Sequence, residues 1–170
     1  FVWIAGSGLW NTAANWNPTG VPAAGSRVTI DAAATVTAGV SAIRFFTLTL
    51  GDPAGTFAPV LLLSTSIASA RNMTVHKNAT FTQGVISTLT FTGDVSFLQG
   101  SLLNHTANTT SPQTAAIDFQ VAGTFVLQAG ATAAVSGLGF NAGAANGGIG
   151  VIAGGGGGNG SAASNSGGSG

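Results

Sequence analysis

The fold of this chain is decided by LTFTGDVSFLQG, residues 89–100, and by its two approximate copies, IASARNMTVHKN at residues 67–78 and FQVAGTFVLQAG at residues 119–130. When the three are aligned, apolar side chains coincide in the first, seventh and ninth positions. These are Ile67, Leu89 and Phe119, then Met73, Val95 and Phe125, then Val75, Phe97 and Leu127. The offsets between copies are 22 and 30 residues. A period in this range, with a loop inserted in one copy, is typical of a solenoid.

The copies read as strands joined by turns. Apolar and polar residues alternate with a period of two and are rich in Val, Thr and Phe, and the same pattern extends over residues 26–140. Asn78, Gly100 and Gly130 close the copies, where a turn or a left-handed residue is expected. Stacking one copy on the next, about 4.8 Å apart, turns their inward residues into one core. The predicted core residues are Leu89, Phe91, Val95, Phe97, Phe119 and Phe125.

The predicted fold is therefore all-β, a β-solenoid, with a β-sandwich as the alternative because sandwiches also use short alternating strands. Residues 1–25 hold all three tryptophans between glycines and prolines, so we expect an aromatic N-terminal cap over an otherwise open core. Residues 141–170 are rich in Gly, Ser and Asn, and are interpreted as a flexible tail or as an inter-subunit segment.

The composition favours association. Only eight of 170 residues carry a fixed charge, the net charge is zero, and the chain has neither Glu nor Cys. A surface with so little charge gives little repulsion between copies. Four bases, which the sequence scatters, cannot supply the basic stripe that nucleic acid requires. No apolar run reaches the roughly 20 residues of a membrane span. The predicted partner is another copy of the chain.

The sequence predicts no catalytic site, no metal site and no cofactor. The acids Asp94 and Asp118 occupy comparable places in the repeat, but the bases that glycan-cleaving sites normally add are scarce. The two imidazoles, His76 and His105, have no clustered third ligand. Pairs of the form Thr-x-Thr, such as Thr47 and Thr49, place hydroxyl groups on one strand face, as ice-binding solenoids do, or serve as ordinary polar strand formers.

Two further sets of residues are candidates for modification or contact. Sequons for N-glycosylation begin at Asn72, Asn78, Asn104, Asn108 and Asn159. The candidate contacts between subunits are the aromatic residues Trp3, Trp10 and Trp16 and the glycine run Gly154, Gly155, Gly156, Gly157 and Gly158.

The N-terminal sequence also carries a resemblance. Trp3, the Gly-Ser-Gly-Leu-Trp of residues 6–10, the Ala-Asn-Trp of residues 14–16 and the Arg-Val-Thr-Ile of residues 27–30 resemble the entry segment of autotransporter-adhesin and filamentous-haemagglutinin-like surface proteins. The resemblance extends as a pattern over residues 1–140. It implies a right-handed parallel β-helix and a role in display, adhesion or scaffolding without catalysis.

These observations lead to one functional hypothesis and two rivals. We expect a non-enzymatic, extracellular structural protein, either a self-assembling filament or surface-appendage subunit or an adhesin stalk module. The rivals are a carbohydrate-binding or carbohydrate-cleaving β-helix, with surface glycans as partners, and an ice-binding β-solenoid.

Overall fold

The computed structural model describes residues 1–39, 41–109, 112–136 and 138 and is all-β, as the sequence predicts. The first sheet has seven strands, in the order β16 (Phe125–Leu127), β13 (Val95–Phe97), β10 (Asn72–Val75), β7 (Thr47–Leu50), β4 (Arg27–Ile30), β1 (Val2–Trp3) and β3 (Trp16–Asn17). The second has six, in the order β17 (Thr132–Ala134), β14 (Leu102–His105), β11 (Thr80–Gln83), β8 (Val60–Leu63), β5 (Thr35–Ala38) and β2 (Gly8–Leu9).

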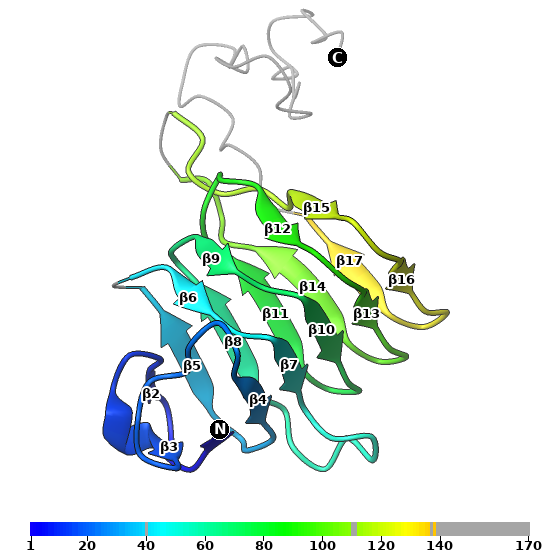
Figure 1. Ribbon diagram of the computed structural model, residues 1–170. Helices are drawn as coiled ribbons and strands as arrows, with labels where there is room; N and C mark the ends of the chain where they lie inside the picture. Colours follow the sequence, from blue (N-terminus) through cyan, green and yellow to red (C-terminus); the bar gives the residue numbers. More distant parts are fainter. Residues whose placement is uncertain (40, 110–111, 137, 139–170) are drawn as a thin grey trace, which may run out of the picture.

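Two smaller sheets follow one another along a third side of the molecule (Figure 1). One pairs β6 (Ile43–Arg44) with β9 (Ile67–Ser69), and the other pairs β12 (Leu89–Phe91) with β15 (Phe119–Val121). β9 and β12 are neighbours, so this side is nearly continuous. A short 3₁₀ turn, η1 (Ala13–Asn15), precedes β3.

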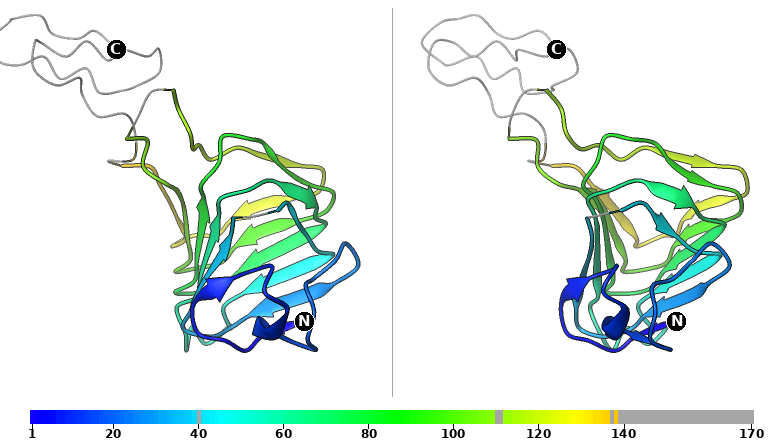
Figure 2. Two further views of the ribbon diagram at one scale, coloured as in Figure 1. Left: turned by 90° about the vertical axis from the view of Figure 1, so that its left-hand side faces the viewer. Right: turned by 60° about the vertical axis from the view of Figure 1, so that its left-hand side comes forward.

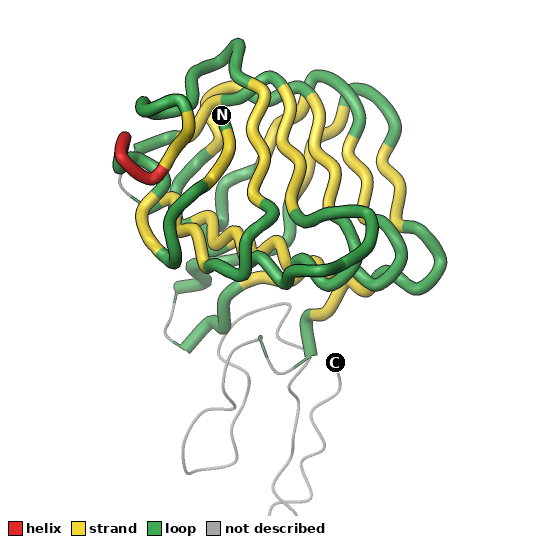
Figure 3. Tube along the Cα trace, turned by 90° about the horizontal axis from the view of Figure 1, so that it is seen from below, coloured by secondary structure: helices red, strands yellow, loops and turns green. Residues whose placement is uncertain are grey.

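The chain visits the three sides in a constant order. From β4 onward, each strand of the first sheet is followed by one of the second sheet and then by one of the small sheets. We call each such set a repeat: β4–β6, β7–β9, β10–β12, β13–β15 and the incomplete β16–β17. Strands of successive repeats pair in parallel, and in Figure 3 those of the first sheet lie side by side.

The registers confirm most of the sequence alignment. Met73 pairs with Val95 and Val95 with Phe125, which reproduces the offsets of 22 and 30 residues. Leu89 pairs with Phe119. Ile67 of β9 pairs with Ile43 of the preceding repeat, and between β9 and β12 Thr92 N donates to Ala70 O at 3.1 Å, again an offset of 22 residues.

The turns between the first and second sheets explain the aligned Asn and Gly residues. Asn78, Gly100 and Gly130 have φ angles of 64°, 77° and 85°, in the left-handed region where a side chain with Cβ is disfavoured. Asn is among the residues that best tolerate this region, and the Asn78 side chain donates a hydrogen bond to Gly55 O at 2.8 Å. The same conformation therefore recurs in three successive repeats.

The core lies between the three sides. Alternate strand residues point inward, so Leu89, Phe91, Val95 and Phe97 are fully buried, as predicted. Phe119 is only half-buried, although its ring packs 5.7 Å from that of Phe91 between centroids. Phe125 was also predicted to lie in the core, and this is wrong: it is 44% exposed because it belongs to the last described repeat.

Candidate functional site

The N-terminal end of the stacked repeats is closed by aromatic side chains. Trp3, Trp10 and Trp16 are at most 2% exposed. The Trp16 ring lies edge-on to both others, with 4.9 Å between centroids in each pair, and Trp10 packs against Phe45 of the core. Figure 2 shows this dark-blue segment across one end of the repeats. The tryptophans were also predicted to contact other copies, and this is wrong, because their buried side chains leave no area for a second molecule.

Hydrogen bonds hold this closure in place. Trp16 Nε1 donates to Trp10 O at 2.7 Å, and Trp3 Nε1 donates to Gly6 O at 2.9 Å. The outermost strand, β3, is antiparallel to β1, only two residues long, and followed by Pro18. Short edge strands and prolines discourage pairing with a further strand. The tryptophan side chains and the edge strand β3 are therefore protected at this end.

The opposite end presents strand edges. Of the strands that the structure describes, β16, β17 and β15 are each the outermost of their sheet. Thr124 O accepts a hydrogen bond from Val95 N, and Gln128 N donates to Phe97 O, so both residues turn their backbone groups toward β13. Backbone groups of alternate residues point to opposite sides of a strand. The amide and carbonyl groups of Phe125 and Leu127 therefore face the open edge.

Apolar side chains accompany these edges. Phe125 and Leu127 are each 44% exposed, Val126 is 37% exposed and Val135 is 54% exposed. A hollow of about 360 Å³ lies at this end, lined by Ile117, Phe119, Val121 and Phe125. An apolar surface beside unpaired strand edges is a template for another polypeptide. The predicted glycine contacts, Gly154 to Gly158, lie outside the described residues.

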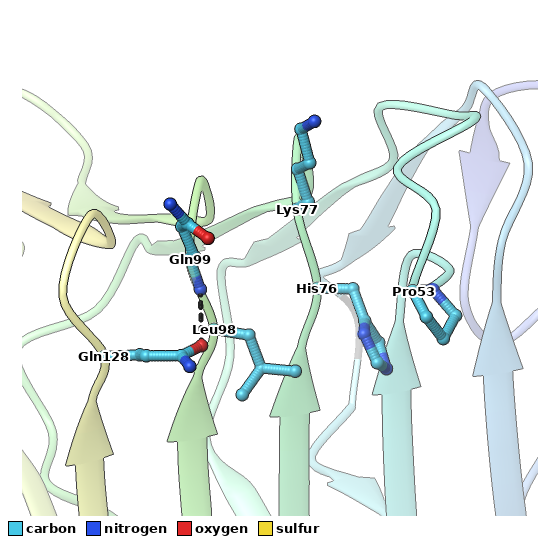
Figure 4. A pocket seen from close by; sticks show the side chains of 6 residues that line it. All are labelled: Pro53, His76, Lys77, Leu98, Gln99 and Gln128. Atoms are coloured by element: carbon cyan, nitrogen blue, oxygen red, sulfur yellow. Dashed lines mark hydrogen bonds between the residues drawn. The ribbon is translucent and has the colours of Figure 1, made fainter.

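A second, polar hollow of about 260 Å³ lies at the turns between the first and second sheets (Figure 4). It is lined by Pro53, His76, Lys77, Leu98, Gln99 and Gln128. The Gln128 carboxamide Oε1 accepts a hydrogen bond from Gln99 N at 2.8 Å, so one lining residue ties two repeats together. These contacts give Gln128 a structural role at the hollow.

His76 and Asp52 interact electrostatically beside this hollow. Burial lowers the pKa of His76 below 6.5, and the negative charge of Asp52 opposes that effect only in part. For Asp52, desolvation raises the pKa, but hydrogen bonds from backbone amides, led by that of Thr56, outweigh it and leave the pKa below 3.8. At neutral pH the His76 imidazole is therefore neutral beside a carboxylate.

The two acids singled out from the sequence serve as links between repeats. Asp94 Oδ1 accepts a hydrogen bond from Thr124 N at 2.8 Å, and Asp118 Oδ2 accepts one from Thr88 Oγ1 at 2.6 Å. Each directly precedes a strand, but Asp118 ends the connection from the second sheet to β15 of the small sheet, whereas Asp94 ends the turn from the small sheet to β13 of the first sheet. The expectation of comparable places in the repeat is wrong, because the two acids occupy different turns.

The histidines do not converge on a common site. His105 is 8% exposed, and its Nδ1 lies 2.7 Å from Thr106 O. His76 lies at the polar hollow, in the turn after β10. Within the part of the chain that the structure describes, no group of three His, Cys, Asp or Glu residues is placed to hold a metal ion.

The sequons differ in exposure. Asn78 is exposed, and Asn72 and Asn104 are half-buried. Asn108 is only 2% exposed, its Nδ2 donates to Ala115 O at 2.9 Å, and its Oδ1 accepts from Ala115 N at 2.9 Å. Glycosylation at Asn108 is therefore wrong for this fold, because a glycan on Nδ2 would replace a donating N–H group and needs space that this buried side chain lacks. Asn159 lies outside the described residues.

The Thr-x-Thr pairs are divided between two sheets. Thr49 stands between Thr29 and Thr74 in the first sheet. In the second sheet, Leu62 separates Thr37 from Thr82. The pairs therefore do not build one flat array of threonines.

Comparison with protein-family models, with curated proteins and with solved structures found no match. Among the described residues, no helix has the length and apolar character needed to cross a bilayer.

Proposed function

We propose that this chain is a non-enzymatic, extracellular structural module, a self-assembling surface-appendage subunit or adhesin stalk, built as a right-handed parallel β-helix. The observation that carries the proposal is the difference between its ends. One end is sealed by three buried tryptophans, and at the other, over the ranges of the chain that the structure describes, strand edges have no partner strand and apolar side chains are exposed.

The β-helix is supported by the order of the strands. Each repeat passes the same three sides before the next is laid on it, and the pairs from β4 onward are parallel. A β-sandwich is built from antiparallel sheets and does not require such stacking. A right-handed path follows from the handedness of nearly all connections between parallel strands. The resemblance to adhesin-like surface proteins leads to the same architecture and to an extracellular setting.

The open end defines how the module joins a partner. Phe125, Leu127 and the hollow beside Phe119 offer apolar contact, and the outward amides of β16 offer hydrogen bonds to an incoming strand. The buried tryptophans and the short strand β3, followed by Pro18, disfavour such pairing at the sealed end, so identical copies stacked through their ends meet open end to open end. Such a two-fold contact closes on itself, and a longer filament requires a second contact elsewhere on the surface.

Sedimentation velocity from low to high micromolar concentration tests this assembly. The wild type is expected to associate with concentration, and Leu127→Lys is expected to stay monomeric, because edge charges oppose strand pairing. Ile4→Lys is the matched control, since Ile4 is 61% exposed at the sealed end. It should associate like the wild type.

Two outcomes would overturn the proposal. The first is a wild type that stays monomeric throughout the concentration range, and the second is an Ile4→Lys variant that loses association together with Leu127→Lys. Negative-stain microscopy of the associated material then distinguishes closed pairs from filaments.

A further inference from the structure

Three of the four basic residues of this chain lie in the segments where the small sheet of β6 and β9 leads into the first sheet, or at the start of the first sheet's strands. Arg27 begins β4, Arg44 ends β6, and Arg71 directly precedes β10. The hydrogen bonds Phe46 N to Ser26 O, at 2.7 Å, and Asn72 N to Phe46 O, at 3.0 Å, stack these segments on one another. The expectation of scattered bases is therefore wrong for this corner, and only Lys77 lies elsewhere, at the turns beside the polar hollow.

Two of these arginines share one aromatic ring. Arg27 Cζ lies 5.6 Å from the centroid of the Phe46 ring, and Arg71 Cζ lies 5.1 Å from it. Phe46 is half-buried, whereas Arg27 and Arg71 are exposed. A guanidinium that rests on a ring loses mobility but keeps N–H groups that point outward. The Phe46 ring thus holds both guanidinium groups in place while their outward N–H groups stay free to bind a ligand.

The charge of this corner is not neutralised from within. In the described ranges of the chain, no ion pair shorter than 4.0 Å is found. The carboxylate closest in register is Asp94, one repeat beyond Asn72, and its Oδ1 accepts a hydrogen bond from Thr124 N. The two guanidinium groups therefore remain available to an external anion.

Hydroxyl groups extend from the arginines along the same outer face. Arg27 pairs with Thr47, and Thr47 pairs with Asn72, which form one column across the strands. The next column is Thr29, Thr49 and Thr74, all half-buried. Successive repeats are spaced by about 4.8 Å, so Arg27 and Arg71 stand two such steps apart. The outer face of the first sheet therefore carries two guanidinium groups that can bind anions, with Thr and Asn side chains between and beside them.

We propose that Arg27, Phe46 and Arg71 form a binding site for the carboxylate or sulfate groups of an acidic polysaccharide. Guanidinium groups bind such planar or multidentate oxyanions through two hydrogen bonds at once. The threonine and asparagine side chains suit the hydroxyl groups of the sugars. Three arginines are too few to neutralise the phosphates of a nucleic acid, whose binding needs many contacts. The site is separate from the open end and does not depend on assembly there.

Binding of short oligogalacturonates (carboxylates) and of sulfated dextran oligomers (sulfates) to the full chain tests the site, measured by isothermal titration calorimetry at low ionic strength. Maltose oligomers serve as the neutral ligand. We expect the acidic oligomers alone to bind, and Arg27→Gln or Arg71→Gln to weaken binding by about tenfold or more. Lys77→Gln, which removes the same charge elsewhere, should leave affinity unchanged. Whichever acid binds more tightly identifies the anionic group.

The double variant Arg27→Lys/Arg71→Lys keeps both positive charges but loses the planar guanidinium groups and their paired N–H donors. It therefore tests whether the site needs guanidinium groups or positive charge alone. We expect it to bind almost as weakly as the Gln variants. Wild-type NMR titration adds a test free of folding effects, with the shifts expected at the Arg27 and Arg71 side chains and at the Phe46 ring. Equal loss in Lys77→Gln, equal binding of maltose oligomers, tighter binding of single-stranded DNA at the same salt, or shifts located elsewhere would each overturn the proposal.

Discussion

Both ends of this molecule carry aromatic side chains, but these are buried at one end and exposed at the other. Trp16 is completely buried at the sealed end, whereas Phe125 is 44% exposed at the open end, although both belong to strands of the first sheet. A stack of parallel strands always leaves apolar side chains and backbone groups at its two ends, because each repeat covers only the one before it. Closing such an end takes residues outside the repeat, and here the tryptophan segment supplies them.

The largest expected effect is a difference in stability between two phenylalanine replacements, one in the buried core and one at the open end. Phe97 and Phe125 lie 6.0 Å apart between ring centroids, but Phe97 is fully buried. Phe97→Asp is expected to prevent folding, with a loss above about 4 kcal/mol, because it leaves an unpaired charge in the core. Phe125→Asp should fold with a stability near that of the wild type, as its carboxylate reaches water.

Circular dichroism and urea unfolding of the two variants provide the measurement. A folded Phe97→Asp with normal stability would contradict the position of the core. A Phe125→Asp as unstable as Phe97→Asp would show that the last repeat is covered in solution, and the contrast between the ends would then be lost.

The sealed end predicts the next largest effect. Trp16→Ala removes the ring on which Trp3 and Trp10 pack and the donor of the hydrogen bond to Trp10 O. We expect a loss of about 3 to 5 kcal/mol in the free energy of unfolding, as for other large-to-small changes in cores. Ile4→Ala is the control at the same end, because Ile4 is 61% exposed and should contribute little.

Hydrogen exchange locates the effect of Trp16→Ala. Exchange in β1 and β4 should accelerate more than exchange in β13, since local opening spreads from the damaged end. Uniform acceleration in all sheets would show that the tryptophans stabilise the whole chain rather than one end.

The contrast between the ends also marks how far the sequence predicts the structure. The repeat was predictable because Met73, Val95 and Phe125 recur in register, and because Asn78, Gly100 and Gly130 occupy one turn conformation. Alternation alone distinguishes inward from outward positions, but it carries no information on which strands have a further repeat stacked on them. This is why Phe125 was placed in the core.

The sites were harder to predict than the fold. Clustered tryptophans indicate a cap or a contact surface equally well, and only the packing of Trp16 between Trp3 and Trp10 decides for the cap. The arginine corner was missed because Arg27 and Arg71 are far apart in sequence. The signal was present where β4, β7 and β10 begin, because their registers place Arg27 one position beyond the aligned pair Phe46 and Arg71.

The smallest expected effect is on the pH dependence of stability and arises in the middle of the stack, at His76. It can be compared with the larger effects expected at the two ends. Burial lowers the pKa of His76 in the folded chain below its value of 6.5 in the unfolded chain. The folded state therefore binds a proton less readily, so this contribution to stability is complete above about pH 6.5 and declines as the pH falls through the folded pKa. His76→Gln should remove that decline, and Asp52→Asn should steepen it, because Asp52 favours the imidazolium.

Urea midpoints measured between about pH 7.5 and pH 5 test the prediction, in a range where the Asp52 carboxylate stays ionised because its pKa lies below 3.8. The wild type should lose more stability over this range than His76→Gln does. If the two lose the same amount, His76 is as solvated in the folded chain as in the unfolded one. The turn after β10 would then be loosely packed.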